Sequence, residues 1–141
     1  MREVYLCWVD DAEDFVASYN GTIELLQHSY AVVLDVDIHY NTRDVDSIAR
    51  NIDNVIYLVD YNLKGNDGAG IDGDELIKLI RRHNSECPII FYSSNATQQE
   101  LRSKVEGLPG ILCVQRESLQ EILTDIATGE IMLRIKGMEK I

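Results

Sequence analysis

At residues 55–60 the chain reads Val-Ile-Tyr-Leu-Val-Asp, an unbroken run of bulky or β-branched side chains that ends in a carboxylate. Such a run is typical of a strand that is buried on both faces in the middle of a parallel sheet. Burial on both faces requires helices above and below the strand, and it places Asp60 where the strand leaves the core. Ligands bind at this carboxyl edge in open α/β sheets. A lone Asp after a strand more often caps a turn, so the role of Asp60 depends on its neighbours.

Four further apolar runs alternate with segments of helical spacing. The expected strands cover residues 4–9, 31–36, 89–92 and 111–114. Helical patterns begin near Asp11, at Thr42, and at three capping boxes formed by the pairs Asp72 and Glu75, Thr97 and Glu100, and Ser118 and Glu121. Five strands alternating with five helices predict an α/β protein with a doubly wound, five-stranded parallel sheet, for which the usual strand order is 2-1-3-4-5.

Two segments interrupt this alternation. Asn20 and Gly21 stand in the middle of the first helical pattern, where they favour a kink or a split. Residues 64–70 are rich in glycine and are expected to form a loop.

Gly129 ends the fifth helix, so we expect one domain over residues 1–129 and a tail over residues 130–141. Apolar side chains at positions 131, 133 and 135 of the tail alternate as in a strand. The same segment is equally compatible with an extension of the last helix.

Composition limits the classes of function. The chain has 141 residues and a net charge of -11, so its surface should repel nucleic acid and anionic membranes. Cys7, Cys87 and Cys113 lie in or beside apolar runs without paired spacing. They are expected to be reduced core thiols of a cytoplasmic protein, because a disulfide framework or a zinc knuckle needs regular pairs. No stretch of the sequence is long and apolar enough to span a bilayer.

The predicted strand order brings several polar side chains together. Strands one and three are neighbours, so Asp10, Asp11 and Asp60 should meet at one carboxyl edge of the sheet. Carboxylates packed together repel each other until one takes up a proton or a cation joins them. Mg²⁺ prefers such oxygen ligands and keeps several waters. Ser93, at the end of strand four, would supply a hydroxyl on the same edge.

This ordered set of residues resembles that of response-regulator receiver domains, over roughly residues 3–128. The resemblance rests on the acidic pair Asp10-Asp11 after strand one, Asp60 after strand three, Asn62-Leu63 just beyond it, Gly73-Asp74-Glu75-Leu76 at a helix start, and the fourth strand from Pro88 to Ser93. It implies a flavodoxin-like receiver fold that acts in two-component signal transduction and is not itself an enzyme.

The resemblance also implies a role for each site residue. Asp60 would accept a phosphoryl group from the phosphohistidine of a histidine kinase. Asp11 would ligate Mg²⁺ directly, Asp10 largely through water, and the backbone carbonyl of Asn62 would complete the protein ligands. Ser93 would turn inward to bind a phosphoryl oxygen. The implied partners are a histidine kinase or a phosphotransfer protein, with an output protein or a second copy of the chain as further candidates.

The sequence departs from the family pattern at the end of strand five and after strand three. The family expects a Lys where this chain has Gln115-Arg116-Glu117, and either Gln115 or Arg116 can be aligned with it. The family also often carries an aromatic residue in this strand, where residues 111–113 read Ile-Leu-Cys. The loop after Asp60 is about four or five residues longer than the family usually has.

One alternative is a phosphatase of the haloacid-dehalogenase type, which uses the pattern Asp-x-Asp-x-Thr/Val after a strand. Asp35 and Asp37 follow an apolar run, but His39 stands where Thr or Val belongs. Asp60 has Asn62 where the second acid is needed. We therefore expect Asp35 and Asp37 to line the sheet edge without ligating anything.

Calcium and nucleotide loops are also unsupported. Lys64 and Ile71 occupy positions at which a calcium loop needs oxygen ligands, and the glycine-rich segment lacks the Gly-Lys-Ser/Thr ending of a phosphate-binding loop. The three histidines, His28, His39 and His83, share no spacing and are expected at the surface.

The remaining alternative is a receiver-like binding module that contacts partners without control by phosphate. The missing Lys supports this alternative, and the retained Asp10, Asp11, Asp60 and Ser93 oppose it.

Overall fold

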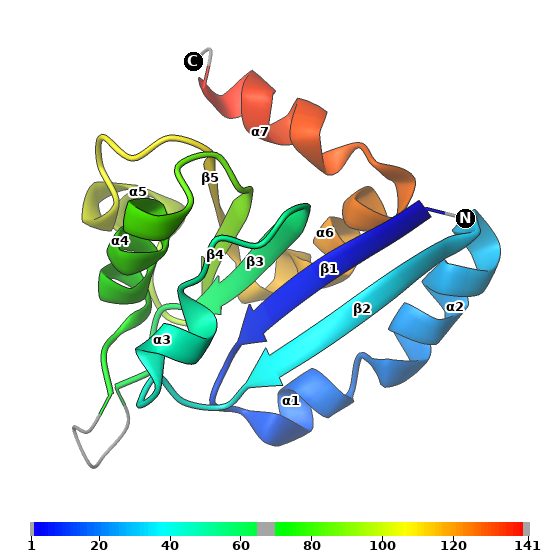
Figure 1. The fold of residues 1–141 in the computed structure, drawn as a ribbon, viewed down its shortest axis with the longest axis horizontal. Helices are drawn as coiled ribbons and strands as arrows, with labels where there is room; N and C mark the ends of the chain where they lie inside the picture. Colours follow the sequence, from blue (N-terminus) through cyan, green and yellow to red (C-terminus); the bar gives the residue numbers. More distant parts are fainter. Residues whose placement is uncertain (1, 65–69, 140–141) are drawn as a thin grey trace.

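The computed structural model describes residues 2–64 and 70–139, with a five-stranded parallel sheet in the order β2-β1-β3-β4-β5 (Figure 1). The strands are β1 (Arg2–Val9), β2 (Val32–His39), β3 (Val55–Asp60), β4 (Ile89–Ser93) and β5 (Ile111–Gln115). The predicted α/β class, parallel sheet and strand order are therefore confirmed.

Helices cover both faces of the sheet (Figure 1). One face packs against α1 (Glu13–Ala17), α2 (Asn20–Tyr30), α6 (Leu119–Thr128) and α7 (Ile131–Glu139). The other face packs against α3 (Val45–Ile48), α4 (Gly73–His83) and α5 (Gln98–Lys104). A short 3-10 helix, η1 (Arg116–Ser118), joins β5 to α6.

Alternation along the strands divides the core into two hydrophobic clusters. Trp8 and Tyr92 belong to the cluster on the α6 side of the sheet, whereas Cys7 and Tyr57 belong to the cluster on the α4 side. β3 is buried over its first five residues. The unbroken apolar run at residues 55–59 is therefore explained, because both faces of this strand are covered.

The first helical segment is split, as the sequence predicted. α1 ends at Ala17 and α2 begins at Asn20. The predicted cap at Thr42 is wrong. The N-cap of α3 is Asp44, and the Thr42 hydroxyl instead exchanges hydrogen bonds with the backbone of Ile71, donating to its carbonyl and accepting from its N–H, both at 2.7 Å.

One of the three predicted capping boxes has the expected cap. Thr97 Oγ1 accepts a 3.1 Å hydrogen bond from the backbone N–H of Glu100 at the start of α5. Asp72 precedes α4 as predicted, but its carboxylate accepts instead from the backbone N–H groups of Leu63 and Lys64. Ser118 makes no side-chain capping bond, because the chain enters α6 through η1.

The tail forms a helix, so the strand interpretation of its alternating side chains is wrong. Ile131 and Ile135 of α7 are buried against the α6-side cluster, and Arg134 bonds to Asp125 of α6 at 2.9 Å. α7 lies at the edge of the sheet where the strands begin, opposite their carboxyl ends (Figure 1). The predicted boundary at residue 129 stays a prediction.

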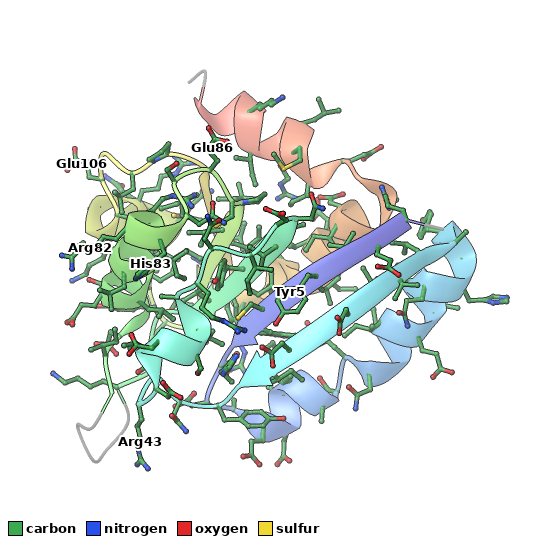
Figure 2. The ribbon with its side chains drawn as sticks, viewed as in Figure 1. Tyr5, Arg43, Arg82, His83, Glu86 and Glu106 are labelled. Carbon is green, nitrogen blue, oxygen red and sulfur yellow. The ribbon has the colours of Figure 1, made fainter. Side chains whose placement is uncertain are left out.

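Other surface and sequence features can be placed on this frame. His28 and His83 are exposed, and Arg82 and His83 lie on the outer side of α4 (Figure 2). His39 is half-buried and bonded to Asp37, so it lies at the surface only in part. The three cysteines are free and buried.

Residues 65–69 of the predicted glycine-rich loop lie outside the described residues. In the described part of the chain, the helices are too short or too polar to cross a membrane.

Candidate functional site

The structure brings together the three carboxylates that the sequence placed at one edge of the sheet. β1 and β3 are parallel neighbours, so Asp10 and Asp11 after β1 meet Asp60 at the end of β3. One carboxylate oxygen of each lies within 4.8 Å of the others. Neighbouring strands that end in acids therefore create the cluster.

Asp10 is held rigidly at the centre of this cluster. It is 1% exposed, and its backbone N–H donates to the carbonyl of His39 at 3.0 Å. Its Oδ1 accepts from the backbone N–H of Ala12 at 2.8 Å, and its Oδ2 accepts from the hydroxyl of Tyr92 at 2.5 Å. Both carboxylate oxygens thus have a partner, as a buried charged group requires.

The Tyr92 contact belongs to a buried chain of hydrogen bonds that the sequence analysis did not predict. The indole Nε1–H of Trp8 donates to the Tyr92 hydroxyl at 2.7 Å, and that hydroxyl donates onward to Asp10. A signal was present, since Trp and Tyr in buried strands need partners for their polar tips. Trp8 lies two residues before Asp10 in the chain, and Tyr92 is the register partner of Asp60.

Burial and mutual repulsion dominate the electrostatics of Asp60. Burial raises its pKa from an ordinary value of 3.8 to about 7, and the negative charges of Asp10 and Asp11 add to the rise. Arg116 and the backbone N–H of Asn62 oppose the increase. The pKa of Asp11 is also raised, by burial first and by Asp10 second, and Arg116 again opposes the rise.

A cation would relieve this repulsion. The donor set consists of carboxylate oxygens, which are the ligands that Mg²⁺ prefers. Asp11 is exposed and Asp60 is half-buried, so the cluster is open to solvent on the side where Mg²⁺ would keep its waters. The residues present therefore fit a hard divalent cation.

Gly73 allows α4 to begin directly against the backbone of Asp60. A Cβ at this position would lie far inside van der Waals contact with the Asp60 carbonyl oxygen, and 3.0 Å from Cε1 of Phe91. The backbone N–H of Gly73 also donates to the carbonyl of Tyr61 at 2.9 Å. Only a residue without a side chain fits here, which gives the predicted Gly-x-Glu-Leu helix start a physical reason.

Ser93 and Gln115 lie side by side at the ends of β4 and β5, where they are register partners. Ser93 is fully buried, and its Oγ accepts from the backbone N–H groups of Asn95 and Ala96 at 3.1 and 3.0 Å. The Gln115 amide donates to the carbonyl of Ala96 at 2.9 Å. Both side chains therefore hold the turn between β4 and α5.

Arg116 supplies the positive charge near the carboxylates. Its guanidinium stacks on the ring of Phe15 with the carbon atom Cζ 3.5 Å from the ring centroid. It lowers the pKa of both Asp11 and Asp60. Its Nε is buried without a hydrogen-bond partner in the described structure. The two residues that the sequence left as alternatives thus differ, since Gln115 bonds to a backbone carbonyl and Arg116 acts on the acids.

Two further predicted positions can be located. Asn62 is exposed just beyond Asp60, and its backbone N–H faces the Asp60 carboxylate. Asp35 is exposed on β2. Asp37 contacts Tyr5 and His39, so it does more than line the edge.

Solved structures with the same doubly wound fold include response-regulator receiver domains. A CheY-like response regulator receiver domain from Methanospirillum hungatei JF-1 superposes with a TM-score of 0.67 at 14% identity, over 95% of this chain and 98% of that one. A response regulator receiver protein from Sinorhizobium medicae WSM419 gives a TM-score of 0.65 at 17% identity, over 92% and 94% of the two chains.

The non-phosphorylated HemR receiver domain from Leptospira biflexa is similar as well, with a TM-score of 0.62 at 19% identity over 91% of this chain and 93% of that one. No protein-family model and no curated protein matches the sequence. The resemblance to receiver domains predicted from the sequence is therefore confirmed at the level of the fold.

Proposed function

We propose that this chain is a phosphoacceptor receiver domain of a two-component system and that Asp60 accepts the phosphoryl group. The observation that carries the proposal is the convergence of the Asp10, Asp11 and Asp60 carboxylates within 4.8 Å. The confirmed fold supports it, because this edge is where ligands bind in sheets of this type.

The residues of the site have separate tasks. A carboxylate oxygen of Asp60 attacks the phosphorus of a phosphohistidine, so that an O–P bond forms as the N–P bond breaks and the imidazole leaves. Asp10, Asp11, Asp60 and the backbone carbonyl of Asn62 would hold Mg²⁺. When bound, the ion neutralises charge on the phosphoryl oxygens. The donor is a histidine kinase or a phosphotransfer protein, and the receiver of the signal is an output protein or a second copy of the chain.

Arg116 takes the place of the family's strand-five lysine in this proposal. It is the residue of the Gln115-Arg116 pair whose charge acts on Asp11 and Asp60. Its stacking on Phe15 holds the guanidinium beside the carboxylates, and its buried Nε has no hydrogen-bond partner in the described structure. Ser93 would bind a phosphoryl oxygen only after its Oγ leaves the backbone N–H groups of Asn95 and Ala96.

A second candidate function is a receiver-like binding module that contacts its partner without phosphorylation. The specific observation in its favour is that Ser93 and Gln115 are both engaged with the β4–α5 turn. A turn held in this way responds little to a phosphoryl group on Asp60.

Intact-mass measurement distinguishes the two functions. The protein is incubated with acetyl phosphate and Mg²⁺, and separately with a phosphorylated histidine donor. The proposal expects the mass of one added phosphoryl group, which disappears in Asp60→Ala. Alanine is preferred to asparagine, because asparagine keeps the shape of the site and leaves neighbouring acids reactive.

Asp35→Ala is the matched control, since Asp35 is an exposed acid on β2 with the same change of side chain. It should keep the added mass. An unmodified wild-type protein that remains folded would favour the binding module, and a modified Asp60→Ala would show that another residue is the acceptor.

A further inference from the structure

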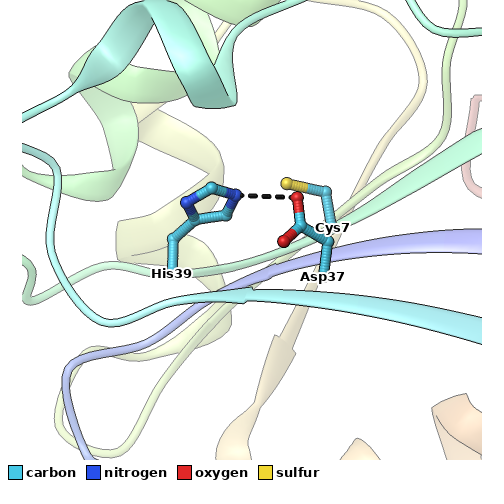
Figure 3. A group of neighbouring side chains, drawn as sticks. All are labelled: Cys7, Asp37 and His39. Atoms are coloured by element: carbon cyan, nitrogen blue, oxygen red, sulfur yellow. Dashed lines mark hydrogen bonds and ion pairs between the residues drawn. The ribbon is translucent and has the colours of Figure 1, made fainter.

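A second group of metal-ligating side chains lies on the α4 side of the sheet. Cys7 on β1 and Asp37 on β2 are register partners. His39 lies two residues beyond Asp37 and therefore projects from the same face of the strand. One ligand atom of each lies within 4.8 Å of the others, and Figure 3 shows the three side chains directed toward one another.

This group of three side chains is buried at one end, at Cys7, and accessible to solvent at the other, at Asp37 and His39. Cys7 is 2% exposed and belongs to the apolar cluster on this face. The side chains of His39 and Asp37 are 20% and 38% exposed. An ion can therefore approach from solvent past the histidine and the carboxylate and reach the thiol.

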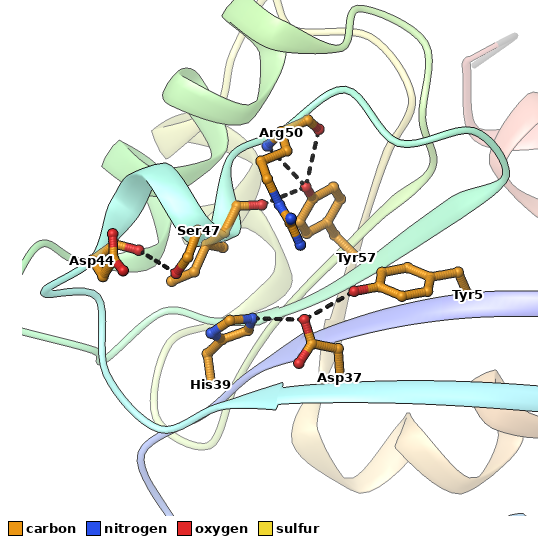
Figure 4. A network of polar contacts seen from close by, with 8 residues as sticks. Tyr5, Asp37, His39, Asp44, Ser47, Arg50 and Tyr57 are labelled. Carbon is orange, nitrogen blue, oxygen red and sulfur yellow. Dashed lines mark hydrogen bonds and ion pairs between the residues drawn. The ribbon is translucent and has the colours of Figure 1, made fainter.

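Hydrogen bonds already orient two of the three ligands. Nε2 of His39 lies 3.0 Å from Oδ2 of Asp37, and the Tyr5 hydroxyl donates to the same oxygen at 2.9 Å (Figure 4). An outer partner of this kind, fixing a carboxylate in place, is typical of protein metal sites. Arg50 points toward the same group from beyond α3 (Figure 4), and its positive charge opposes the rise in the pKa of the Cys7 thiol.

We propose that Cys7, Asp37 and His39 bind Zn²⁺, with water as the fourth ligand. Sulfur, imidazole nitrogen and carboxylate oxygen are the three ligand types that zinc accepts, and three protein ligands plus water give its tetrahedral geometry. This donor set is unsuited to Mg²⁺, which prefers oxygen alone. The proposed zinc site does not depend on the function of the carboxylate cluster at Asp60.

The observed spacing is close to what zinc requires. Zinc bonds of about 2.0–2.1 Å to nitrogen and oxygen place those two atoms roughly 3.3 Å apart in a tetrahedron. The His39 and Asp37 atoms are 3.0 Å apart, so the ion would take the place of the proton between them. The Cys7 sulfur lies within 4.8 Å of both atoms.

Binding converts the thiol of Cys7 into a thiolate. Burial raises the pKa of this thiol to about 12, so it is protonated in the metal-free protein and is a poor nucleophile. When the Zn–S bond forms, the S–H bond breaks and its proton passes to solvent.

Cobalt substitution tests the site directly. Co²⁺ is titrated into the metal-free protein in excess Mg²⁺, a hard cation that does not compete for a thiolate. We expect a thiolate-to-cobalt charge-transfer band at one equivalent, with tetrahedral visible absorption, and its displacement by Zn²⁺. Cys7→Ser should abolish the band. His39→Gln and Asp37→Asn should weaken binding more than Tyr5→Phe, for which the loss of an outer partner predicts roughly a 10–100-fold reduction in affinity.

Three controls separate this site from others. Cys113→Ala removes a thiol that is equally buried on the same face, His28→Gln removes an exposed histidine, and Asp11→Asn alters the carboxylate cluster. All three should keep the band. A wild-type protein without the band, a band that survives in Cys7→Ser, or full affinity in both His39→Gln and Asp37→Asn would overturn the proposal. If Cys7→Ser does not fold, the two half-buried ligand variants decide the outcome.

Discussion

The hydroxyl of Tyr92 donates a 2.5 Å hydrogen bond to Oδ2 of Asp10 and so connects the interior of β4 to the carboxylate cluster. The same hydroxyl accepts from the indole of Trp8 at 2.7 Å. Because all three groups are buried, Asp10 cannot turn to another partner without leaving a polar group unsatisfied. The carboxylate closest to the core is therefore positioned by the core itself.

Replacing Tyr92 with Phe should destabilise the fold and weaken Mg²⁺ binding. The change leaves the Trp8 indole and one oxygen of Asp10 without a partner, and each buried unsatisfied group costs about 1–3 kcal/mol. Thermal melting gives the change in stability, and the Mg²⁺-dependent rise in Tm gives the change in affinity.

Tyr57→Phe is the matched control for Tyr92→Phe. The Tyr57 hydroxyl is also buried, and it donates to the carbonyl of Ile48 at 2.6 Å on the other face of the sheet. This control should lower stability and leave Mg²⁺ affinity unchanged. Equal losses of Mg²⁺ affinity in the two variants would mean that Tyr92 acts through general stability alone.

Gly73→Ala should lower stability and disturb Asp60, although alanine normally favours a helix. The added Cβ collides with the carbonyl oxygen of Asp60, and relief of such overpacking costs about 1–3 kcal/mol. Gly21→Ala in α2 is the control, because a Cβ there meets nothing within 4 Å. It should stabilise the protein by roughly 0.5–1 kcal/mol. Denaturant unfolding measures both, and a Gly73→Ala variant as stable as Gly21→Ala would contradict the packing argument.

Stability in the absence of Mg²⁺ should fall as the pH rises from about 4 toward 7. The pKa of Asp60 is raised from 3.8 to about 7 in the folded protein, so the folded state binds more protons than the unfolded state between these values. Protonated Asp60 therefore stabilises the folded state. This stabilisation is fully present below the pKa that Asp60 has in the unfolded chain, and it is lost as the pH rises through the pKa of Asp60 in the folded protein. Its upper limit is roughly 4 kcal/mol.

Denaturant unfolding in EDTA across this pH range measures the fall in the free energy of unfolding. The Asp60→Asn variant should show a smaller dependence of this free energy on pH. Mg²⁺ should restore most stability at the upper end of the range, because there it competes with fewer protons. Metal-free stability that rises steadily from pH 4 to 7 would show that Asp60 is not buried beside like charges as described.

Much of the architecture was accessible from sequence, because the apolar runs are local and end in polar residues. The run at 55–59 specified a strand covered on both faces, and the acids after two neighbouring strands specified the cluster at Asp10, Asp11 and Asp60. Each of these features needs only strand order and the periodicity of side chains.

Several of the errors concern side chains whose partners lie outside their own helix or strand. Thr42 and Asp72 look like helix caps, but each has a backbone partner on a segment that the fold brings alongside. The Trp8 to Tyr92 contact spans 84 residues, and the proximity of His39 to Cys7 depends on the register of β1 against β2. Local propensity carries no information about such pairings.

The last prediction concerns the replacement for the family's lysine. We expect Arg116→Gln to raise the pKa of Asp60 further, because Arg116 opposes the repulsion of Asp10 and Asp11 in the folded protein. The variant should also weaken the response to beryllofluoride, which mimics a phosphoryl group. Gln115→Ala should affect neither, because the Gln115 amide bonds to the carbonyl of Ala96 and not to the acids. The pKa is followed by carboxyl NMR titration, and the response by amide spectra.

In the wild type, the amide shifts that beryllofluoride causes along α5 and β5 should be small. Gln115 ties β5 to Ala96, and the Gln98 side chain at the start of α5 donates to the carbonyl of Cys113 at 2.8 Å. The guanidinium of Arg116 is wide and planar, so its charge is less concentrated on one phosphoryl oxygen than the charge of a lysine ammonium would be. Arg116→Lys should therefore enlarge the amide shifts more than Gln115→Lys. Large shifts across α5 and β5 in the unmodified protein would show that the domain switches without the lysine, and a larger gain in Gln115→Lys would make residue 115 the equivalent position.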